Sequence, residues 1–337
     1  MIKSFIERAW YKGHPVIWIL WPLMQLYKLV TSLRRLLYKL GIKKRITLPV
    51  PVIVVGNITV GGNGKTPVVV WLAKLLTEQG FNVGVISRGY GGQSREPLIV
   101  RVNTSAEVCG DEPKLIVNQT GCLMAVGADR ISTAKLLLEY AEKKNSALDI
   151  IISDDGLQHY RLDRQSEIVV VDGERRFGNE CLLPMGPLRE GKWRLGQADL
   201  IINNGGSSCF GEERMQLQPQ AFCSVANNEP VEHINIVDKK IVAMAGIGYP
   251  QRFFNTLTTM GLAVDRQHAF ADHQAFDSST INALTGEGEV LLMTEKDAVK
   301  CQAFAQDNWF YLPVSAKLTD TATQKILDKV KEIKNGF

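Results

Sequence analysis

The sequence predicts an α/β protein with a largely parallel sheet and a second, smaller α/β domain. Three observations lead to this fold class. Short β-branched runs alternate with helical patterns, as in strand–helix–strand units. A glycine-rich turn joins the first of these strands to the helix that follows. The chain has 337 residues, enough for about two domains, and its 45% hydrophobic and 22% charged residues are ordinary globular composition.

Residues 1–46 precede the first strand and carry a strong positive charge. They contain ten Lys or Arg and one acid, Glu7, whereas the whole chain has 39 basic and 35 acidic residues. Lys28, Arg35 and Lys39 share one helical face, so the segment is predicted to form an amphipathic helix with a cationic side. The apolar positions on another face are Leu23, Leu26, Val30, Leu33, Leu37 and Leu40.

This basic head also contains three tryptophans and three tyrosines, whose rings favour the headgroup level of a bilayer. Its uncharged run, 13–27, is interrupted by Pro15 and Pro22 and is shorter than the about 20 residues that a spanning helix needs. We therefore expect a membrane-associated helix that binds an anionic membrane surface. Docking onto the body is the alternative, and the bulky aliphatic content argues against a nucleic-acid-binding arm.

The cysteines and the head together indicate the compartment. All six cysteines are dispersed and none has zinc-ligand spacing, which fits a reducing environment. Because no small-residue cleavage site follows the apolar stretch, a cleaved signal peptide is not expected. The catalytic body is accordingly expected to face the cytoplasm.

The first core strand leads into a predicted phosphate-binding loop. Residues 51–56 read as a buried strand and 68–79 as a helix. This order of elements predicts a P-loop and a P-loop-containing nucleotide hydrolase-like core. Backbone N–H groups of the loop would bind phosphate oxygens, Lys65 would reach the β and γ phosphates, and Thr66 would ligate Mg²⁺. The loop itself is Thr59-Val60-Gly61-Gly62-Asn63-Gly64-Lys65-Thr66, with Thr59 where the general pattern has glycine.

A later strand ends in two acids. Residues 148–153 form a buried-strand run followed by Asp154 and Asp155, which resembles a Walker B strand. A carboxylate at the carboxyl end of a neighbouring parallel strand can reach the Mg²⁺ that phosphoryl transfer requires. An Asp-Asp-Gly turn without a metal role is the alternative. Guanine specificity is not supported, because 294–297 does not match the Asn-Lys-x-Asp pattern.

The remaining elements suggest four segments. The head covers 1–46, the P-loop kinase core 47–225, a linker 226–239, and a smaller C-terminal α/β domain 240–337. Further strands are expected at 82–87, 123–127, 149–153, 167–172 and 199–203 in the core, and at 240–246, 289–294 and 309–314 in the second domain. Helices are expected at 129–143, 251–260 and 319–334.

Several motifs, taken in order, resemble the tetraacyldisaccharide 4'-kinase family of lipid A biosynthesis. The resemblance extends over nearly the whole chain and includes the threonine at Thr59. It is carried by 56–67 around the P-loop, Ser87-Arg88-Gly89-Tyr90-Gly91, Gly110-Asp111-Glu112-Pro113, Asp154-Asp155-Gly156-Leu157-Gln158-His159, Leu183-Pro184-Met185-Gly186-Pro187-Leu188-Arg189-Glu190 and Asp272-His273.

The resemblance implies a reaction and a place for it. The enzyme would transfer the γ-phosphoryl group of ATP, with Mg²⁺, to the 4'-hydroxyl of an acylated glucosamine disaccharide 1-phosphate. It would work at the cytoplasmic face of a Gram-negative inner membrane, with no nucleic-acid partner. A membrane-associated P-loop ATPase without a lipid acceptor, and a non-catalytic nucleotide sensor, are the alternatives.

The resemblance also implies residue roles beside that of Lys65. Asp111 would be the catalytic base and His273 its partner, although Asp111 as a helix cap and His273 as a surface residue are the alternatives. Arg189 would contact phosphate or the leaving group, with a solvated loop arginine as the alternative. Arg88, which follows the strand 83–87 and precedes a glycine-rich loop, would contact substrate phosphate. The Mg²⁺ shell would draw on Thr66, Asp154, Asp155, Gln158 and Glu190.

Overall fold

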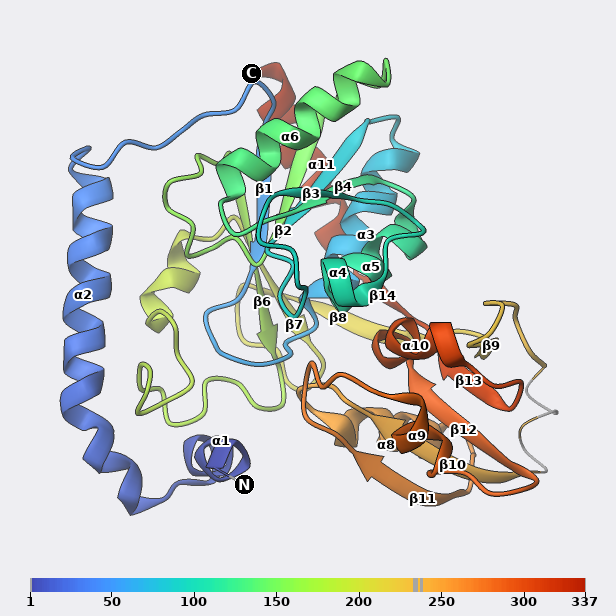
Figure 1. Ribbon diagram of the computed structural model, residues 1–337. Coiled ribbons are helices and arrows are strands. Elements are labelled where there is room, and N and C mark those ends of the chain that lie inside the picture. The colour runs from blue at the N-terminus through green and yellow to red at the C-terminus, as the bar shows by residue number, and fades with distance from the viewer. Residues whose placement is uncertain (1, 233–235, 237–238, 337) are drawn as a thin grey trace.

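The computed structural model describes residues 2–232, 236 and 239–336. In this part of the chain, a nine-stranded sheet and a five-stranded sheet each carry helices, and a helical arm extends from the N-terminus (Figure 1). The alternating strands and helices of the body therefore confirm the predicted α/β fold.

The larger sheet has the order β14-β8-β7-β6-β1-β5-β2-β4-β3. Its strands pair in parallel except β3 and β14, which run antiparallel to their neighbours. Every core strand expected from the sequence is present, while β3, β8 and β14 were not expected. The bounds are β1 Val52–Gly56, β2 Val83–Ser87, β3 Leu98–Val100, β4 Leu123–Val126, β5 Ile150–Asp154, β6 Ser166–Asp172, β7 Leu200–Asn204, β8 Glu212–Pro219 and β14 Val314–Leu318.

Helices cover both faces of this sheet and bury two apolar cores. On one face, side chains of α3, α5 and α11 pack against β-branched residues such as Val55 and Ile152. On the other, α6 packs against residues that include Val54 and Ile151. Because neighbouring residues of one strand point to opposite faces, an unbroken apolar strand is what a sheet covered on both sides requires. The helices are α3 Lys65–Glu78, α4 Ala106–Cys109, α5 Asp111–Thr120, α6 Arg130–Lys143, η2 Lys192–Gln197 and α11 Asp320–Asn335.

The smaller sheet has the order β11-β10-β12-β13-β9, with β9 antiparallel. It too is covered on both faces, by α8 on one side and by α9 and α10 on the other. Its strands are β9 Cys223–Ser224, β10 Lys240–Ala245, β11 Val264–Ala269, β12 Glu289–Thr294 and β13 Trp309–Leu312. The helices are α8 Pro250–Thr259, α9 Ser278–Asn282, α10 Glu295–Cys301 and η3 Gln302–Phe304.

The chain returns to the larger sheet at its C-terminal end, which differs from the expected arrangement. We expected 240–337 to form one domain, but β14 pairs with β8 and α11 buries Ile326 and Val330 in the core of the larger sheet. Conversely, β9 lies before residue 226 and joins the smaller sheet. Part of the expected linker, 233–235 and 237–238, lies outside the described residues. The division of the chain into a core and a second domain stays a prediction.

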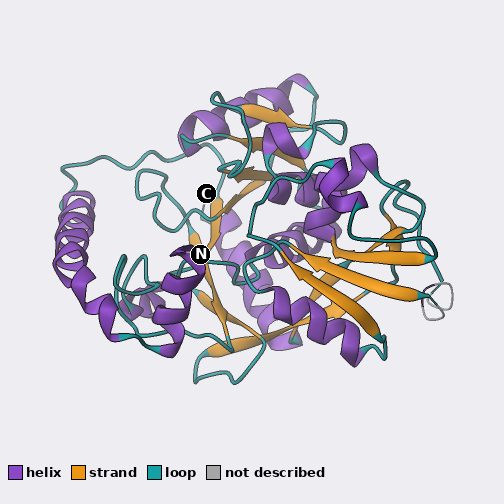
Figure 2. Cartoon of the chain, turned by 60° about the horizontal axis from the view of Figure 1, so that its bottom comes forward, coloured by secondary structure: helices purple, strands orange, loops and turns teal. Residues whose placement is uncertain are grey.

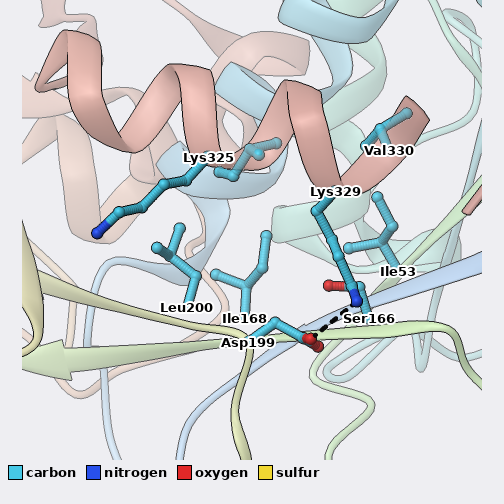
Figure 3. A pocket seen from close by; sticks show the side chains of 9 residues that line it. Ile53, Ser166, Ile168, Asp199, Leu200, Lys325, Lys329 and Val330 are labelled. Atoms are coloured by element: carbon cyan, nitrogen blue, oxygen red, sulfur yellow. Dashed lines mark ion pairs between the residues drawn. The ribbon is translucent and has the colours of Figure 1, made fainter. Parts of the chain in front are cut away.

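Helix α11 leaves a small cavity of 230 Å³ against the larger sheet. Figure 3 shows Lys329 pointing from α11 to Asp199, with which it forms an ion pair at 3.4 Å, while Ile168 and Leu200 form an apolar floor. The cavity lies beneath the start of β7, at the opposite end of the strands from the glycine-rich loop, so it is separate from the site described below.

The N-terminal arm consists of α1 Ile2–Lys12, η1 Pro15–Leu20 and α2 Trp21–Lys39. Pro15 and Pro22 each lie in the first turn of a helical element, where a missing N–H removes no helical hydrogen bond. Pro15–Lys39 is therefore a continuous helical stretch of 25 residues that is long and apolar enough to cross a membrane by length and composition alone. The expectation that prolines interrupt this run and leave it too short is wrong.

Helix α2 stands at the edge of the molecule with only one side against the body (Figures 1 and 2). On that side Tyr27 donates a hydrogen bond to the carbonyl of Arg189 at 2.9 Å, and the ring of Tyr38 packs against Tyr160. None of its residues is buried. Exposed aliphatic side chains face away from the body: Leu23, Leu26, Leu29, Val30, Leu33, Leu36 and Leu40.

Candidate active site

The glycine-rich loop and the two acids meet at one edge of the larger sheet. Strands β1 and β5 are parallel neighbours, and Val55 pairs with Asp154 in their register. The carboxyl ends of both strands therefore point the same way, and the segments that follow them lie side by side. This is the edge at which open α/β sheets bind ligands.

Gly64 caps α3 in a conformation that a side chain would not tolerate. Its φ is +85°, and a Cβ there would lie 2.2 Å from the side-chain nitrogen of Asn204. That nitrogen donates to the carbonyl of Asn63 at 3.0 Å, which fixes the loop from the end of β7, a strand separated from β1 by β6. The loop thus depends on glycine for its conformation and on Asn204 for its position.

Thr59 fills the position at which the general loop pattern has glycine. It is 2% exposed, and its hydroxyl accepts a hydrogen bond from the side chain of Asn63 at 2.6 Å. The Asn57 side chain donates to the Thr59 carbonyl at 2.8 Å. Since the backbone of Thr59 is not left-handed, a threonine is accommodated and adds a hydrogen bond within the loop.

Lys65 begins α3 and points toward the acids. Its ammonium lies 3.3 Å from the side-chain oxygen of Asn57 and 3.7 Å from Oδ1 of Asp155. Thr66 follows in the first turn of the helix and lines the same cavity. The helix N-terminus adds partial positive charge there, so loop, lysine and helix form a site for an anion.

Asp154 is buried with one oxygen unpaired. Oδ2 accepts a hydrogen bond from Ser87 at 3.1 Å, while Oδ1 has no partner among the described residues. Burial, and secondarily the charge of Glu112, raises the pKa of Asp154 to about 7. A carboxylate in this setting is costly unless a cation accompanies it.

Asp155 is already paired. Nη1 of Arg189 donates to both of its oxygens at 2.9 Å. Burial alone would raise the pKa of Asp155, but the charges of Lys65 and Arg189 outweigh burial and hold the pKa well below its usual range. Arg189, predicted to contact phosphate or the leaving group, is thus engaged with a carboxylate in this structure, and its role toward substrate stays a prediction.

Gln158 and Glu190 lie together beside this pair. The amide of Gln158 donates to Oε2 of Glu190 at 3.1 Å and to the carbonyl of Asn57 at 3.3 Å. Tyr160 donates to the other oxygen of Glu190, and Arg194 lies 3.5 Å from Oε2. Both oxygens of Glu190 are therefore occupied by protein groups, and the metal roles of Gln158 and Glu190 stay predictions.

Asp111 and His273 come together from the two halves of the molecule. Asp111 is 5% exposed at the start of α5, and Nδ1 of His273 lies 3.1 and 3.2 Å from its two oxygens. Burial alone would raise the pKa of Asp111, but the hydrogen bond from His273 and the charge of Lys296 lower it below its usual value. His273 has φ +61°, a left-handed backbone that the fold holds in place.

Lys296 was not identified from the sequence. It follows β12 within Thr294-Glu295-Lys296-Asp297, a segment whose one predicted property was the lack of a guanine-binding pattern. Its position directly after a buried strand is the signal that would have found it, because polar residues at the carboxyl ends of parallel strands gather at ligand sites.

Lys65, Arg189, His273 and Lys296 line a cavity of 740 Å³ between the two sheets, whereas Asp111 and Asp154 are not among the described residues of its wall. Arg88 is exposed at the end of β2, and its charge acts on His159. Burial, followed by the charges of Arg130, Arg34 and Arg88, lowers the pKa of His159 to about 4, so its ring is neutral at pH 7. The cavity wall includes Gly61, Lys65, Thr66, Glu112, Arg189, Gly248, Asp272, His273 and Lys296.

The donor set suits a magnesium nucleotide rather than a metal held by protein alone. Among residues 2–232, 236 and 239–336, no group of three His, Cys, Asp or Glu side chains converges to bind a metal. Magnesium in nucleotide sites takes one or two protein ligands and completes its shell with phosphate oxygens and water. The unpaired oxygen of Asp154 fits this pattern.

The fold and the site together define a P-loop nucleotide-binding enzyme of the phosphotransferase class. Residues 16–331 match the family model described as "Tetraacyldisaccharide-1-P 4'-kinase". The chain therefore belongs to the tetraacyldisaccharide 4'-kinase family, which confirms the resemblance in the sequence motifs.

Individual relatives agree over almost the whole chain. A tetraacyldisaccharide 4'-kinase of Shewanella oneidensis is 51% identical over 98% of this chain and 97% of its own. One of Vibrio campbellii is 49% identical over 98% of each. Among solved structures, the "apo" form of LpxK from Aquifex aeolicus in complex with ATP matches with a TM-score of 0.79 and 30% identity, covering 94% of this chain and 99% of that one.

Proposed function

We propose that this protein transfers the γ-phosphoryl group of ATP to the 4'-hydroxyl of a tetraacyldisaccharide 1-phosphate. This step adds the second phosphate of a lipid A precursor. One observation carries the proposal: the P-loop Lys65 and His273 line a single cavity, where Lys65 lies 3.7 Å from Asp155 and His273 lies 3.1 Å from Asp111. Membership of the kinase family supports the same reaction.

In the proposed reaction the chain holds the triphosphate through the N–H groups of 60–66 and the ammonium of Lys65. Thr66 and Asp154 would hold Mg²⁺, which supplies charge neutralisation between the β and γ oxygens when bound. Arg189 and Lys65 keep Asp155 ionised beside it, since both cations lie within 3.7 Å of that carboxylate.

Asp111 would accept the proton of the 4'-hydroxyl as the hydroxyl oxygen bonds to the γ phosphorus. The bond from the γ phosphorus to the bridging oxygen breaks, and ADP leaves. The low pKa of Asp111 keeps it ionised at neutral pH, and His273 fixes its orientation through Nδ1. A positioned base of this kind typically contributes about 10²–10⁴-fold to the rate. The alternative, that Asp111 only caps α5, has less support. Within α5 its side chain accepts a hydrogen bond from the adjacent N–H of Glu112 alone. Both of its oxygens, in contrast, lie within 3.2 Å of Nδ1 of His273.

The arm supports a place at the membrane surface. Tyr27 and Tyr38 are three helical turns apart and both contact the body, so α2 lies along the body rather than leaving it. Its outward side is the exposed aliphatic face, of which Leu29 is 66% exposed. We propose that this face rests in the interfacial region of the cytoplasmic leaflet, where an acylated substrate is found.

The test is direct. The purified chain is incubated with ATP, Mg²⁺ and a tetraacyldisaccharide 1-phosphate in detergent micelles, and the lipid is analysed by mass spectrometry. We expect one added phosphate that disappears in a Lys65→Met variant and with Mg²⁺ chelated. ATP hydrolysis without a phosphorylated lipid would favour the ATPase alternative, and nucleotide binding without turnover would favour the sensor.

A further inference from the structure

Lys296 occupies the centre of an acidic cluster beside the Asp111–His273 pair. Its ammonium lies 3.0 Å from Oδ1 of Asp272, 3.1 Å from Oε1 of Glu112 and 3.8 Å from Oδ2 of Asp111. Nε2 of His273 lies 3.4 Å away. A single cation, whose side chain is 15% exposed, therefore contacts both members of the proposed base pair and the two acids that flank them.

The surroundings keep Lys296 charged. Burial alone would lower the pKa of Lys296, but the charges of Glu112, Asp111 and Asp272 outweigh burial and raise it. Removing one partner from a buried ion-pair cluster leaves the others uncompensated, which is strongly unfavourable. Without Lys296, three carboxylates would face one another around His273.

The cluster also spans the two halves of the molecule. Asp111 and Glu112 begin α5 on the larger sheet, whereas Lys296 is the second residue of α10 and follows β12 of the smaller sheet. The neighbouring residue Glu295 accepts a hydrogen bond from Gln119 on α5 at 2.5 Å, a second link between the same two helices. The distance between Asp111 and His273 thus depends on how α10 docks against α5.

We propose that Lys296 is a positioning residue for the Asp111 base: its ammonium holds Asp111 ionised and holds the second domain, with His273, against it. This inference rests on the proposed function, in which Asp111 accepts the proton of the sugar hydroxyl. Lys296 acts through Asp111 and takes no part in the bond changes itself.

The sign of the expected pH effect follows from the surrounding charges. A positive charge near a carboxylate lowers its pKa, so loss of Lys296 raises the pKa of Asp111. Because the base works when ionised, the acidic limb of the pH–rate profile then moves to higher pH. The other titratable groups facing the pair are Glu112 on α5, Cys109 on α4, Asp272 after β11, Tyr90 after β2 and Lys300 on α10.

The experiment compares Lys296→Met and Lys296→Arg with the wild type, and uses Lys325→Met as a control. Lys325 is a surface lysine of α11 whose one ion pair among the described residues is with Glu213, at 2.6 Å. We expect Lys296→Met to lose about a hundredfold in kcat, since displacement of a catalytic group by about 1 Å has that effect. The acidic limb of its pH–rate profile should move to higher pH, whereas in Lys296→Arg the limb should lie at the wild-type pH. Lys325→Met should match the wild type.

A double-mutant cycle separates positioning from simple stabilisation. If Lys296 acts through Asp111, adding Lys296→Met to Asp111→Asn should cost little further activity. Losses that multiply, or a Lys296→Met enzyme with wild-type kcat and an unmoved limb, would overturn the inference. Should Lys296→Met fail to fold, the cycle is run with Lys296→Gln, and Lys296→Arg still reports on the limb.

A measurement without turnover keeps this inference distinct from the proposed function. The pKa of Asp111 is followed by ¹³C NMR of its carboxyl carbon in the full chain. We expect a value below the ordinary one in the wild type and a higher one in Lys296→Met. An identical titration in both proteins would refute the role of Lys296 even if lipid phosphorylation were confirmed, whereas a wild type that phosphorylates no lipid would refute only the function.

Discussion

Arg189 donates to both oxygens of Asp155, while the adjacent Asp154 keeps one oxygen unpaired. Two neighbouring acids at the end of one strand therefore have opposite electrostatic surroundings. Asp155 is held ionised by cations, and the pKa of Asp154 is raised to about 7 chiefly by burial. Their substitutions should consequently differ in sign.

The first prediction is that Asp154→Asn stabilises the nucleotide-free protein at pH 8. Because the pKa of Asp154 is raised from 3.8 to about 7, its stabilising protonated form is lost as pH rises through 7. Asparagine mimics that form at every pH. We expect a higher Tm at pH 8 and a smaller rise near pH 5, which already lies above the unfolded pKa of 3.8, together with loss of kinase activity because the Mg²⁺ ligand is removed.

Asp155→Asn is the matched comparison. It removes the partner of Lys65 and Arg189, so Tm should fall at pH 7 and recover little on raising the pH. Thermal unfolding of both variants at pH 5 and pH 8, without nucleotide, measures the contrast. Two variants with the same change in Tm at pH 8 would show that the difference in pairing has no energetic consequence.

The second prediction concerns the base. Asp111→Ala should cut kcat by about 10²–10⁴-fold while ATP affinity stays close to that of the wild type. Asp111 lies at the start of α5, so loss of a cap would instead appear as a lower Tm with kcat preserved. Steady-state kinetics, calorimetry with ATP and thermal unfolding on the same protein decide between the two roles.

Local sequence patterns were enough to predict the central strands of the larger sheet, the P-loop and the two acids at the end of β5. Each depends on residues close together in the chain: an apolar run of strand length, a glycine-rich turn, or a polar residue directly after a strand. The parallel pairing of β1 with β5 then brings Lys65 and Asp155 together. The meeting of Asp111 and His273 came from family resemblance, since no local pattern joins residues 162 positions apart.

Other features depend on contacts that no local pattern records. Lys296 and Glu112 are 184 positions apart, and their contact arises from the docking of α10 on α5. The return of β14 to the larger sheet depends on pairing with β8, in which Met215 alone is buried and which lacks the apolar run of a central strand. The prediction that Pro15 and Pro22 interrupt the helix was wrong, because the effect of a proline depends on where each helix begins and both lie in a first turn.

The third prediction tests the loop. Gly64→Ala should abolish detectable ATP binding, because alanine at φ +85° is strained and its Cβ would collide with Asn204. Gly80→Ala is the matched control: Gly80 follows the other end of α3 at φ +84° with no atom within 4 Å of a Cβ. Both carry a left-handed strain of about 1–2 kcal/mol, but only the first includes the collision. Equal ATP affinity in the two variants would contradict the proposed loop geometry.

The final prediction concerns α2. Replacing Leu26, Leu29 and Leu33 with Gln removes apolar surface that faces away from the body and leaves the Tyr27 contact intact. We expect binding to anionic vesicles to fall sharply, because interfacial binding scales with the apolar area inserted. Activity on a micellar substrate should remain near that of the wild type, since none of the three residues touches the cavity.

Tyr27→Phe is the complementary variant. It keeps the aliphatic face but removes the hydrogen bond to the Arg189 carbonyl, so vesicle binding should persist while kcat falls if the arm helps to hold 189–190 in place. Vesicle co-sedimentation and micellar kinetics on both variants separate anchoring from positioning. If the leucine variant sediments with vesicles as well as the wild type does, the membrane surface lies elsewhere on the molecule, because the exposed side of α2 would then contribute nothing to attachment.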